Sequence, residues 1–344
     1  MKVLLTGCTG FIGWKVCEFL LEQGYFVIGV DNLNDAYDVR LKKWRLDRLM
    51  KYSNFAFYRV DITNLPALER LFSQQCEHTT EQYSSSHSPF IAVLNLAARA
   101  GVRQSLEDPW IYFDTNVTGT LNLLELCHRY GVNKFILAST SSVYGVNERP
   151  FREDQSTDWP LSPYAASKKA AEALCYAYHR LYGINIVVLR YFTVYGPAGR
   201  PDMSIFRFIC WIAEGKPVTV YGDGNQERDF TYVDDIAHGT VSALSFLVRS
   251  ARHASPVYEI INLGSDHPVT VNTVIGLVEE LLGRKAVVVH KPPHPADVLA
   301  TWADITKAKQ VLNWEPRTNL EDGLRHTVNW YLENRDWAKG ITLL

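Results

Sequence analysis

The first half of the chain alternates between short apolar runs and longer segments that carry one apolar face at helical spacing. Apolar runs that predict buried strands lie at 2–6, 25–30, 55–60, 91–96, 134–139 and 184–190. Segments with a helical apolar face lie at 11–23, 38–51, 64–76, 110–130 and 164–182. Such alternation is typical of a parallel sheet with helices on both faces. We therefore predict an α/β fold built on a doubly wound parallel sheet.

The pattern changes near residue 196, where proline and glycine become frequent and the elements become shorter. Helical faces remain at 204–214, 234–248, 271–283 and 304–312. This half should form a smaller lobe that covers the carboxyl ends of the strands, where a second ligand could bind. The polar stretch at 77–88 interrupts the first half, and we expect it to be a surface loop without catalytic residues.

A glycine-rich turn joins the first predicted strand to the first helix: Gly7-Cys8-Thr9-Gly10-Phe11-Ile12-Gly13. The glycines let the backbone approach a diphosphate, and the helix N-terminus supplies N–H groups. The second strand ends in Asp31-Asn32. A carboxylate there can accept hydrogen bonds from both ribose hydroxyls of an adenosine and would repel a 2′-phosphate. The turn and Asp31 together predict a Rossmann-type site that favours NAD over NADP.

Further cofactor contacts are expected at the ends of later strands, because these ends line the ligand crevice. Asp61-Ile62 follow the third strand and should lie near the adenine. Leu96-Ala97-Ala98 end the fourth strand with small side chains that allow close approach of the cofactor. Thr115 and Asn116 either lie beside the cofactor or simply cap a helix.

Tyr164 and Lys168 are four residues apart on a predicted helix, which places both side chains on one face. A tyrosine has an ordinary pKa of about 10, and a nearby ammonium favours the phenolate. The pair can therefore form a base that takes a proton from a hydroxyl near neutral pH. This spacing arises often by chance, and the preceding nucleotide-binding turn is what favours the catalytic interpretation.

Composition narrows the function classes. The chain has 344 residues, 47% of them hydrophobic, and a net charge of −2 with no basic run, so nucleic-acid binding has no electrostatic support. No apolar stretch is long enough to span a membrane, and the first strand begins too close to Met1 for a signal peptide. The cysteines show neither CxxC nor metal-ligand spacing, which predicts no metal site and reduced thiols in the cytoplasm. They are Cys8, Cys17, Cys76, Cys127, Cys175 and Cys210.

The fifth strand runs into Ser139-Thr140-Ser141-Ser142-Val143-Tyr144-Gly145, four hydroxyls that could bind a ligand or cap a helix. With the glycine turn and the Tyr164/Lys168 pair, this run resembles the extended short-chain dehydrogenase/reductase, or NAD-dependent epimerase/dehydratase, superfamily over essentially the whole chain. The same resemblance is carried by the runs at 116–120, 189–197, 221–224 and 228–235. The closest resemblance is to UDP-glucuronate 4-epimerases, through 31–38, 100–103 and 196–203. That family usually has histidine where this chain has Asn95.

The resemblance implies a NAD-dependent 4-epimerase that interconverts UDP-glucuronate and UDP-galacturonate through a 4-keto intermediate, with NAD tightly bound and recycled. Tyr164 would take the proton from the 4-hydroxyl, Thr140 would hydrogen-bond the 4-oxygen, and Lys168 would lower the tyrosine pKa and hold the nicotinamide ribose. Ser139 and Tyr191 are expected beside the cofactor. A homodimer is expected through the helices at 110–130 and 164–182. Residues 1–195 would form the NAD-binding Rossmann domain, with sheet elements returning near 230–265, and 196–344 mainly the UDP-sugar lobe.

The family pattern also implies a substrate site. Arg228 should bind the diphosphate, because arginine binds phosphate in bidentate fashion. Arg200, Tyr221 and Asp297 match family positions near the uridine, although Asp297 could equally cap a loop. Arg103 either reaches the substrate or only forms a surface salt bridge.

The hydroxyl side chains near the end of the fifth strand help to distinguish epimerisation from decarboxylation. A 4-keto uronate is a β-keto acid and loses carbon dioxide easily, so an epimerase must hold the carboxylate out of line with the carbonyl. Neutral hydroxyls could do this by charge-assisted hydrogen bonds from Thr140, Ser141, Ser142 and Thr193. Related decarboxylases typically carry glutamate at the position of Ser142, and 4,6-dehydratases carry Asp-Glu in this stretch. The alternatives are a UDP-glucose or UDP-N-acetylglucosamine 4-epimerase and a UDP-glucuronate decarboxylase. A non-enzymatic NAD-sensing protein is disfavoured because Tyr164, Lys168 and Thr140 are all present.

Overall fold

The computed structural model describes residues 1–77, 88–250, 255–293 and 298–343. The polar stretch predicted as a loop at 77–88 lies outside these residues except at its two ends, and so does Asp297. Within the described ranges, every helix is too short or too polar to span a membrane.

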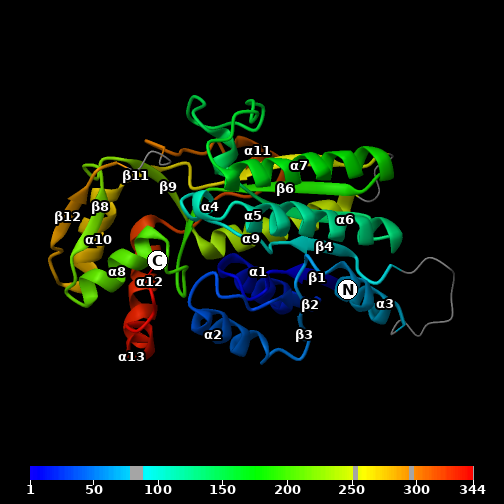
Figure 1. The fold of residues 1–344 in the computed structure, drawn as a ribbon, viewed down its shortest axis with the longest axis horizontal. Coiled ribbons are helices and arrows are strands. Elements are labelled where there is room, and N and C mark those ends of the chain that lie inside the picture. Colours follow the sequence, from blue (N-terminus) through cyan, green and yellow to red (C-terminus); the bar gives the residue numbers. More distant parts are fainter. Residues whose placement is uncertain (78–87, 251–254, 294–297, 344) are drawn as a thin grey trace.

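A seven-stranded parallel sheet forms the larger part of the molecule, with the strand order β10-β6-β5-β4-β1-β2-β3 (Figure 1). The strands are β1 (Lys2–Thr6), β2 (Phe26–Asp31), β3 (Phe55–Arg59), β4 (Ala92–Asn95), β5 (Lys134–Thr140), β6 (Asn185–Tyr191) and β10 (Tyr258–Leu263). The strand order reverses between β1 and β4, and in doubly wound sheets ligands bind at such a reversal. The predicted fold class is confirmed, and six of these strands lie where the apolar runs place them.

Helices cover both faces of this sheet (Figure 1). On one face pack α1 (Phe11–Glu22), α2 (Val39–Leu49), α9 (Val233–Ser250) and α11 (Thr306–Leu312). On the other pack α3 (Leu65–Glu77), α6 (Gly119–Arg129) and α7 (Pro163–Tyr182). Successive strand residues alternate between the two cores: Leu5 belongs to the first and Leu4 to the second.

The helix predicted at 110–130 is interrupted. The segment contains α5 (Trp110–Phe113), a π-helical turn η1 (Asp114–Thr118) and then α6, preceded by the short α4 (Gln104–Glu107). The turn places the Asn116 side chain against the backbone of Arg99, where it bonds both the N–H and the carbonyl at 2.9 and 3.0 Å. Turns of this kind are frequent at functional sites.

The smaller lobe lies beside the carboxyl ends of the strands and has its own apolar core, at the left of Figure 1. Its elements are β7 (Thr193–Tyr195), α8 (Ser204–Ala213), β8 (Val218–Tyr221), β9 (Glu227–Tyr232), β11 (Pro268–Thr270), α10 (Val271–Leu282), β12 (Val288–Lys291), α12 (Leu320–Glu333) and α13 (Arg335–Ala338). They include a β11-β9-β7 sheet and a β12-β8 pair. The chain crosses between the two parts repeatedly, because α9, β10 and α11 return to the large sheet.

The two parts are joined by a fully buried arginine. Arg45 on α2 donates to the carbonyl oxygen of Thr9 in the glycine turn at 2.9 Å and to that of Ala198 at 2.6 Å. It also donates to the Tyr37 hydroxyl at 2.6 Å. One guanidinium therefore connects the glycine turn to the segment that enters the smaller lobe.

Candidate active site

A cavity of about 460 Å³ opens at the carboxyl ends of the strands, next to the smaller lobe. It collects most of the residues singled out from the sequence. Those that line it are Gly7, Gly10, Phe11, Ile12, Gly13, Asp31, Asn32, Asp61, Ile62, Leu96, Ala97, Ala98, Thr115, Ser139, Thr140, Ser141, Ser142, Tyr164, Lys168, Tyr191, Thr193, Arg200 and Arg228. The cavity thus brings together residues that are more than 200 positions apart in the sequence.

The glycine turn is shaped for close contact. Gly7 has a φ of +71°, and a Cβ there would lie 2.6 Å from the backbone nitrogen of Ala97. A Cβ on Gly13 would lie 2.0 Å from the carbonyl oxygen of Gly7. Gly10 is the N-cap of α1 and has no side chain to satisfy the N–H groups of the first turn. These groups face the cavity, which fits the diphosphate of a dinucleotide.

Asp31 is held at the end of β2. Its carboxylate accepts hydrogen bonds from the backbone N–H groups of Leu33 at 2.8 Å and Thr9 at 3.2 Å, and Lys42 lies 3.7 Å away. Asn32 donates to the Asp61 carboxylate at 2.7 Å. Burial alone would raise the pKa of Asp61, but hydrogen bonds from Thr63 and Asn32 outweigh it and hold that pKa below the usual value. Two carboxylates with fixed orientations therefore lie where an adenosine is expected.

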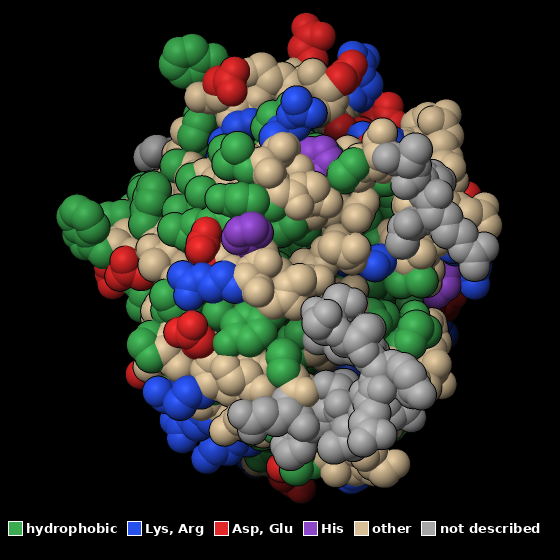
Figure 2. Space-filling model, turned by 90° about the vertical axis from the view of Figure 1, so that its right-hand side faces the viewer, with side chains coloured by type: hydrophobic (Ala, Val, Ile, Leu, Met, Phe, Trp, Pro, Cys, Tyr) green, Lys and Arg blue, Asp and Glu red, His purple; other side chains and the backbone are tan. Residues whose placement is uncertain are grey.

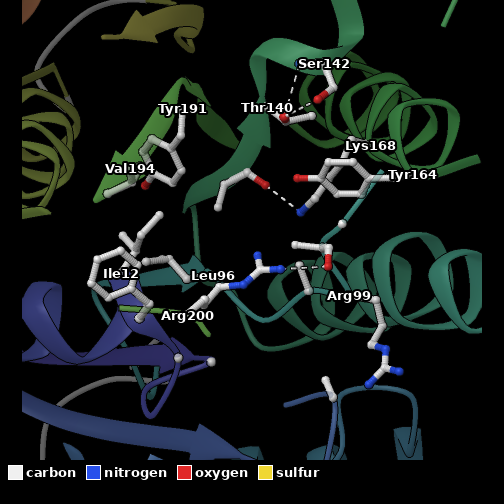
Figure 3. A pocket seen from close by; sticks show the side chains of 18 of the residues that line it. Ile12, Leu96, Arg99, Thr140, Ser142, Tyr164, Lys168, Tyr191, Val194 and Arg200 are labelled. Atoms are coloured by element: carbon white, nitrogen blue, oxygen red, sulfur yellow. Dashed lines mark hydrogen bonds between the residues drawn. The ribbon is translucent and has the colours of Figure 1, made fainter. Parts of the chain in front are cut away.

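The pair on α7 faces the same cavity (Figure 3). Ser162 caps the helix by accepting from the Ala165 N–H at 3.2 Å, and Pro163 begins it. Lys168 is buried, and its ammonium donates to the carbonyl oxygen of Ala138 on β5 at 2.8 Å. The Tyr164 ring packs edge-on against Tyr112, with centroids 6.0 Å apart. Helix α7 and strand β5 together fix both side chains.

Burial opposes charge on both members of the pair. It raises the pKa of Tyr164, although a hydrogen bond with Thr140 and the charge of Arg200 act in the lowering direction. It lowers the pKa of Lys168 to about 8, against the raising effect of Glu172. The sequence predicted that Lys168 would lower the tyrosine pKa. In the structure, desolvation of Tyr164 is the larger effect on its pKa, and the groups that lower this pKa are Thr140 and Arg200.

Hydroxyl groups form the wall above this pair. Thr140 ends β5, and its oxygen accepts from the Ser142 N–H at 3.2 Å at the start of a 3₁₀ turn, η2 (Ser141–Tyr144). It also donates to the Ser142 hydroxyl at 3.2 Å. Ser141 and Thr193 line the cavity as well. Thr140 therefore caps the turn and also lines the cavity, and its contact with a ligand stays a prediction.

Two residues that are expected beside the cofactor, Ser139 and Tyr191, turn their hydroxyls away from the cavity. Ser139 donates to Glu172 at 2.5 Å, so its hydroxyl points into the core. The Tyr191 hydroxyl is 2.9 Å from that of Thr240 on α9. Both hydroxyls have partners in the core, so the two residues line the cavity with other atoms.

Three expected site residues do not line the cavity. Asn116 is buried and bonds the Arg99 backbone and the Ser167 hydroxyl, so it supports the cavity wall from behind. Arg103 lies over the Tyr221 ring, 4.0 Å from its centroid, so these two side chains contact each other. Both ends of the Asn116 amide have partners within the protein, and a cofactor contact by this residue stays a prediction.

Asn95 replaces a usual histidine without leaving a buried polar group unpaired. It accepts from the Thr6 hydroxyl at 2.7 Å and donates to the Thr120 hydroxyl at 3.0 Å. Thr120 in turn donates to the carbonyl oxygen of Asn116 at 2.6 Å. The substitution is therefore accommodated by a hydroxyl on each side.

The arginines mark a second end of the cavity. Arg200 binds Asp202 with two hydrogen bonds, of 3.0 and 2.5 Å, and donates to the Ala100 carbonyl oxygen at 3.0 Å. It points toward the space beside Tyr164, whereas Arg99 points toward another part of the cavity (Figure 3). Arg228 on β9 donates to the Glu227 carbonyl oxygen at 2.8 Å. Cationic groups thus line the same cavity as Tyr164 and Lys168.

Sequence reasoning missed other cavity residues, among them Tyr37, Lys42, Arg99 and Tyr112. Tyr37 belongs to the 31–38 run, which carried a resemblance but no residue role. Lys42 could have been noticed as a cation on a helix that follows Asp31 closely. Arg99 directly follows the Leu96-Ala97-Ala98 strand end, and that adjacency was the available signal.

Comparisons with known proteins agree with this geometry. The family model described as NAD dependent epimerase/dehydratase matches residues 3–264. A UDP-glucuronate 4-epimerase of Thermodesulfobacterium geofontis is 58% identical over 339 residues, which cover 98% of each chain. UDP-glucuronic acid 4-epimerase from Bacillus cereus, solved with UDP-glucuronic acid and NAD, matches with a TM-score of 0.86 and 38% identity. A UDP-glucose 4-epimerase from Thermotoga maritima, solved with UDP-glucose, matches with a TM-score of 0.83 and 35% identity. Both matches cover 97% of this chain and 100% of the other.

Proposed function

The chain belongs to the NAD dependent epimerase/dehydratase family, and we propose that it interconverts UDP-glucuronate and UDP-galacturonate by inversion at C4. The observation that carries this proposal is the wall of neutral hydroxyls above Tyr164 and Lys168, with serine at both 141 and 142. The cofactor is NAD, which fits the glycine turn and Asp31 and stays bound through the cycle.

Tyr164 is the base in this proposal. As phenolate it takes the proton from the sugar 4-hydroxyl, and Thr140 holds the 4-oxygen by a hydrogen bond. The glycine turn and Asp31 would hold NAD, which would supply a reversible hydride acceptor for C4. Inversion requires that the 4-keto sugar present its other face before it is reduced again. Lys168 holds a ribose hydroxyl and, while charged, favours the phenolate.

The hydroxyl wall keeps the carboxylate of the 4-keto sugar in place. Ser141, Ser142 and Thr193 donate to its oxygens, so the bond to C5 stays out of line with the ketone. A glutamate at 142 would repel the carboxylate, which is why serine there favours epimerisation over decarboxylation. Because the T. maritima relative was solved with UDP-glucose, a neutral UDP-sugar is the alternative substrate to test.

The nucleotide end of the substrate would lie toward Arg228 and Arg200. Both line the cavity, and a guanidinium can bind a phosphate through two N–H groups. Arg103 and Tyr221 pack on each other and are not among the residues that line the cavity, so a uridine contact by either stays a prediction. Asp297 lies outside the described residues, and its role stays a prediction.

The decisive experiment is incubation of the purified protein with UDP-glucuronate, with products analysed by mass spectrometry and NMR. We expect UDP-galacturonate at unchanged mass. Loss of 44 mass units of carbon dioxide, giving a UDP-pentose, would assign a decarboxylase instead. Turnover of UDP-glucose without turnover of UDP-glucuronate would assign a neutral-sugar epimerase.

We further propose a homodimer formed by α6 and α7. Apolar and aromatic side chains remain exposed on and near them, notably Phe113, Tyr176, Leu181 and Tyr182. Figure 2 views the end where these helices finish, and hydrophobic side chains gather on the left of that face. Light scattering should give twice the chain mass of 39.1 kDa, and a monomer at micromolar concentration would contradict the proposal.

We also propose that the protein acts in the cytoplasm. All six cysteines are thiols, and five of them are buried, which suits a compartment that keeps thiols reduced. Fractionation of the native cells, followed by detection of the protein with an antibody, would test this.

A further inference from the structure

A buried ion pair lies directly behind the proton-transfer pair. Glu172 on α7 accepts from Arg190 on β6 through two hydrogen bonds, Nε at 3.0 Å and Nη2 at 2.8 Å. It also accepts from the Ser139 hydroxyl at 2.5 Å. Both side chains of the pair are 2% exposed. An ion pair buried this deeply is weak evidence for stability, because a protein with apolar residues in its place is often as stable.

The position of Glu172 links it to the site. It lies four residues after Lys168 and eight after Tyr164, on the same face of α7. Consecutive residues of β5 hold the two α7 side chains: the Ala138 carbonyl accepts from Lys168, and the Ser139 hydroxyl donates to Glu172. The next residue is Thr140, at the cavity. Two hydrogen bonds thus set the register of α7 on the strand that presents Thr140.

The charges around Lys168 give Glu172 a second effect. Burial lowers the pKa of Lys168 to about 8, and Glu172 acts against that shift. Six other titratable groups around Lys168 and Glu172 are neutral at pH 7, because burial raises the pKa of each. They are Tyr164 and Cys175 on α7, Cys127 on α6, Tyr191 on β6, Tyr144 on η2 and Tyr258 on β10. Arg190 faces Glu172, and Arg200 faces Tyr164.

We propose that Glu172 is a positioning residue of the proton-transfer site: it keeps the Lys168 ammonium charged and holds α7 in register on β5. The inference rests on the proposed roles of Tyr164 and Lys168. Without Glu172, a neutral lysine beside a neutral tyrosine becomes the favoured state of the coupled pair. The phenolate then forms only at higher pH, so activity is lost near neutrality and returns under alkaline conditions.

The first test is Glu172→Gln, which keeps the shape and removes the charge. We expect turnover of UDP-glucuronate at pH 7 to fall on the order of 10- to 100-fold. The rising limb of the pH–rate profile should move upward by about one to two pH units, and NAD should stay bound. Glu279→Gln, which removes a carboxylate from the surface pair with Lys285, is the matched control and should keep the parent profile.

Glu172→Gln leaves the Arg190 guanidinium buried without its carboxylate, which can destabilise the fold. The double variant Glu172→Leu/Arg190→Met avoids this. It removes both charges with little change in volume, and we expect the same displaced profile. If Glu172 and Arg190 only stabilised the fold, the double variant would have a lower melting temperature but the same pH–rate profile as the parent. A folded double variant with the parent profile would overturn the proposal.

A second readout separates this proposal from the proposed function. Protein carrying ¹³Cε-labelled lysine is titrated by NMR, with Lys168→Met used to assign the resonance. The Lys168 transition should move to lower pH in both Glu172 variants. An unmoved transition would refute the inference even in a protein that epimerises UDP-glucuronate. A moved transition supports the inference even where the substrate proves to be another sugar.

Discussion

At the scale of single residues, the proposed proton chemistry rests on Tyr164 and Lys168, and burial favours the neutral form of each. The site is ready for proton transfer because hydrogen bonds and neighbouring charges act against that burial. Thr140 and Arg200 do so for Tyr164, and Glu172 does so for Lys168. Activity should therefore depend on pH more steeply than stability does around neutrality.

Removal of the Tyr164 hydroxyl tests the base. Tyr164→Phe should lower turnover roughly 10²- to 10⁴-fold, because proton transfer then lacks a positioned base. NAD content after purification, measured by absorbance of the released cofactor, should be unchanged. Tyr176→Phe, an exposed tyrosine on the same helix, is the control and should keep full activity. Parent-like activity in Tyr164→Phe would show that the base is a different group.

Lys168 should lower the stability of the folded protein in the same pH range in which its charge is needed for the proposed activity. Its folded-state pKa of about 8 lies below the unfolded value near 10.5. Between those values the unfolded chain binds more protons, so the free energy of unfolding rises with pH across that window. The penalty is fully present below pH 8 and amounts to about 3 kcal/mol.

We therefore expect Lys168→Met to be inactive yet more stable than the parent at pH 7. The advantage should shrink as pH rises from 8 to 10.5. Urea unfolding of the two proteins at pH 7, 9 and 10.5 measures it. A variant that is less stable at every pH would show that the hydrogen bond to Ala138 outweighs the burial of the charge.

At the scale of elements, the glycine turn gives a matched comparison. Gly7 and Gly24 both have positive φ, but a Cβ on Gly7 would lie 2.6 Å from Ala97 backbone, whereas a Cβ on Gly24 meets nothing within 4 Å. Gly24→Ala should cost roughly 1 kcal/mol of stability and keep NAD. Gly7→Ala should weaken NAD retention roughly tenfold or more, because the glycine turn must move away from the Ala97 backbone to make room for the Cβ. Equal NAD content in both variants would contradict this role of the turn.

Six strands of the large sheet and most helices could be predicted, because their apolar periodicity matches how they are buried. No individual range was predicted for β10 or for the short strands of the smaller lobe. The π turn η1 could not be predicted, because it depends on the Asn116 side chain meeting the Arg99 backbone across the fold. Helix α12 was missed although Asn319 caps it, accepting from the Asp322 N–H at 2.9 Å. Leu324 and Val328 at helical spacing were a readable signal for it.

At the scale of the whole molecule, elements that follow the smaller lobe in the sequence pack on the large sheet, so their place in the fold differs from their place in the chain. The segment 304–312 was assigned to the smaller lobe, yet α11 packs on α9 and β10 of the large sheet. The cavity residues predicted from motifs were brought together as expected, since they follow strand ends. The contact of Arg103 with the Tyr221 ring could not be predicted, because tertiary packing sets that pair.

This interleaving predicts that residues 1–195 alone will not fold. One face of the large sheet would lose α9 and α11, and β6 would lose its partner β10. Exposed apolar side chains such as Leu189 and Val187 should then bind a hydrophobic dye. A fragment with the near-ultraviolet circular dichroism of a packed protein would contradict the expectation.

The guanidinium of Arg45 bears on protein engineering. It bonds the glycine turn and Ala198 at once, so the two parts of the enzyme are not interchangeable modules. A chimera that takes its sugar-binding lobe from a relative must also match the chain path at 198–199, or provide a different residue at 45. Designers who seek new sugar specificity should therefore change residues within the hydroxyl wall and leave this junction intact.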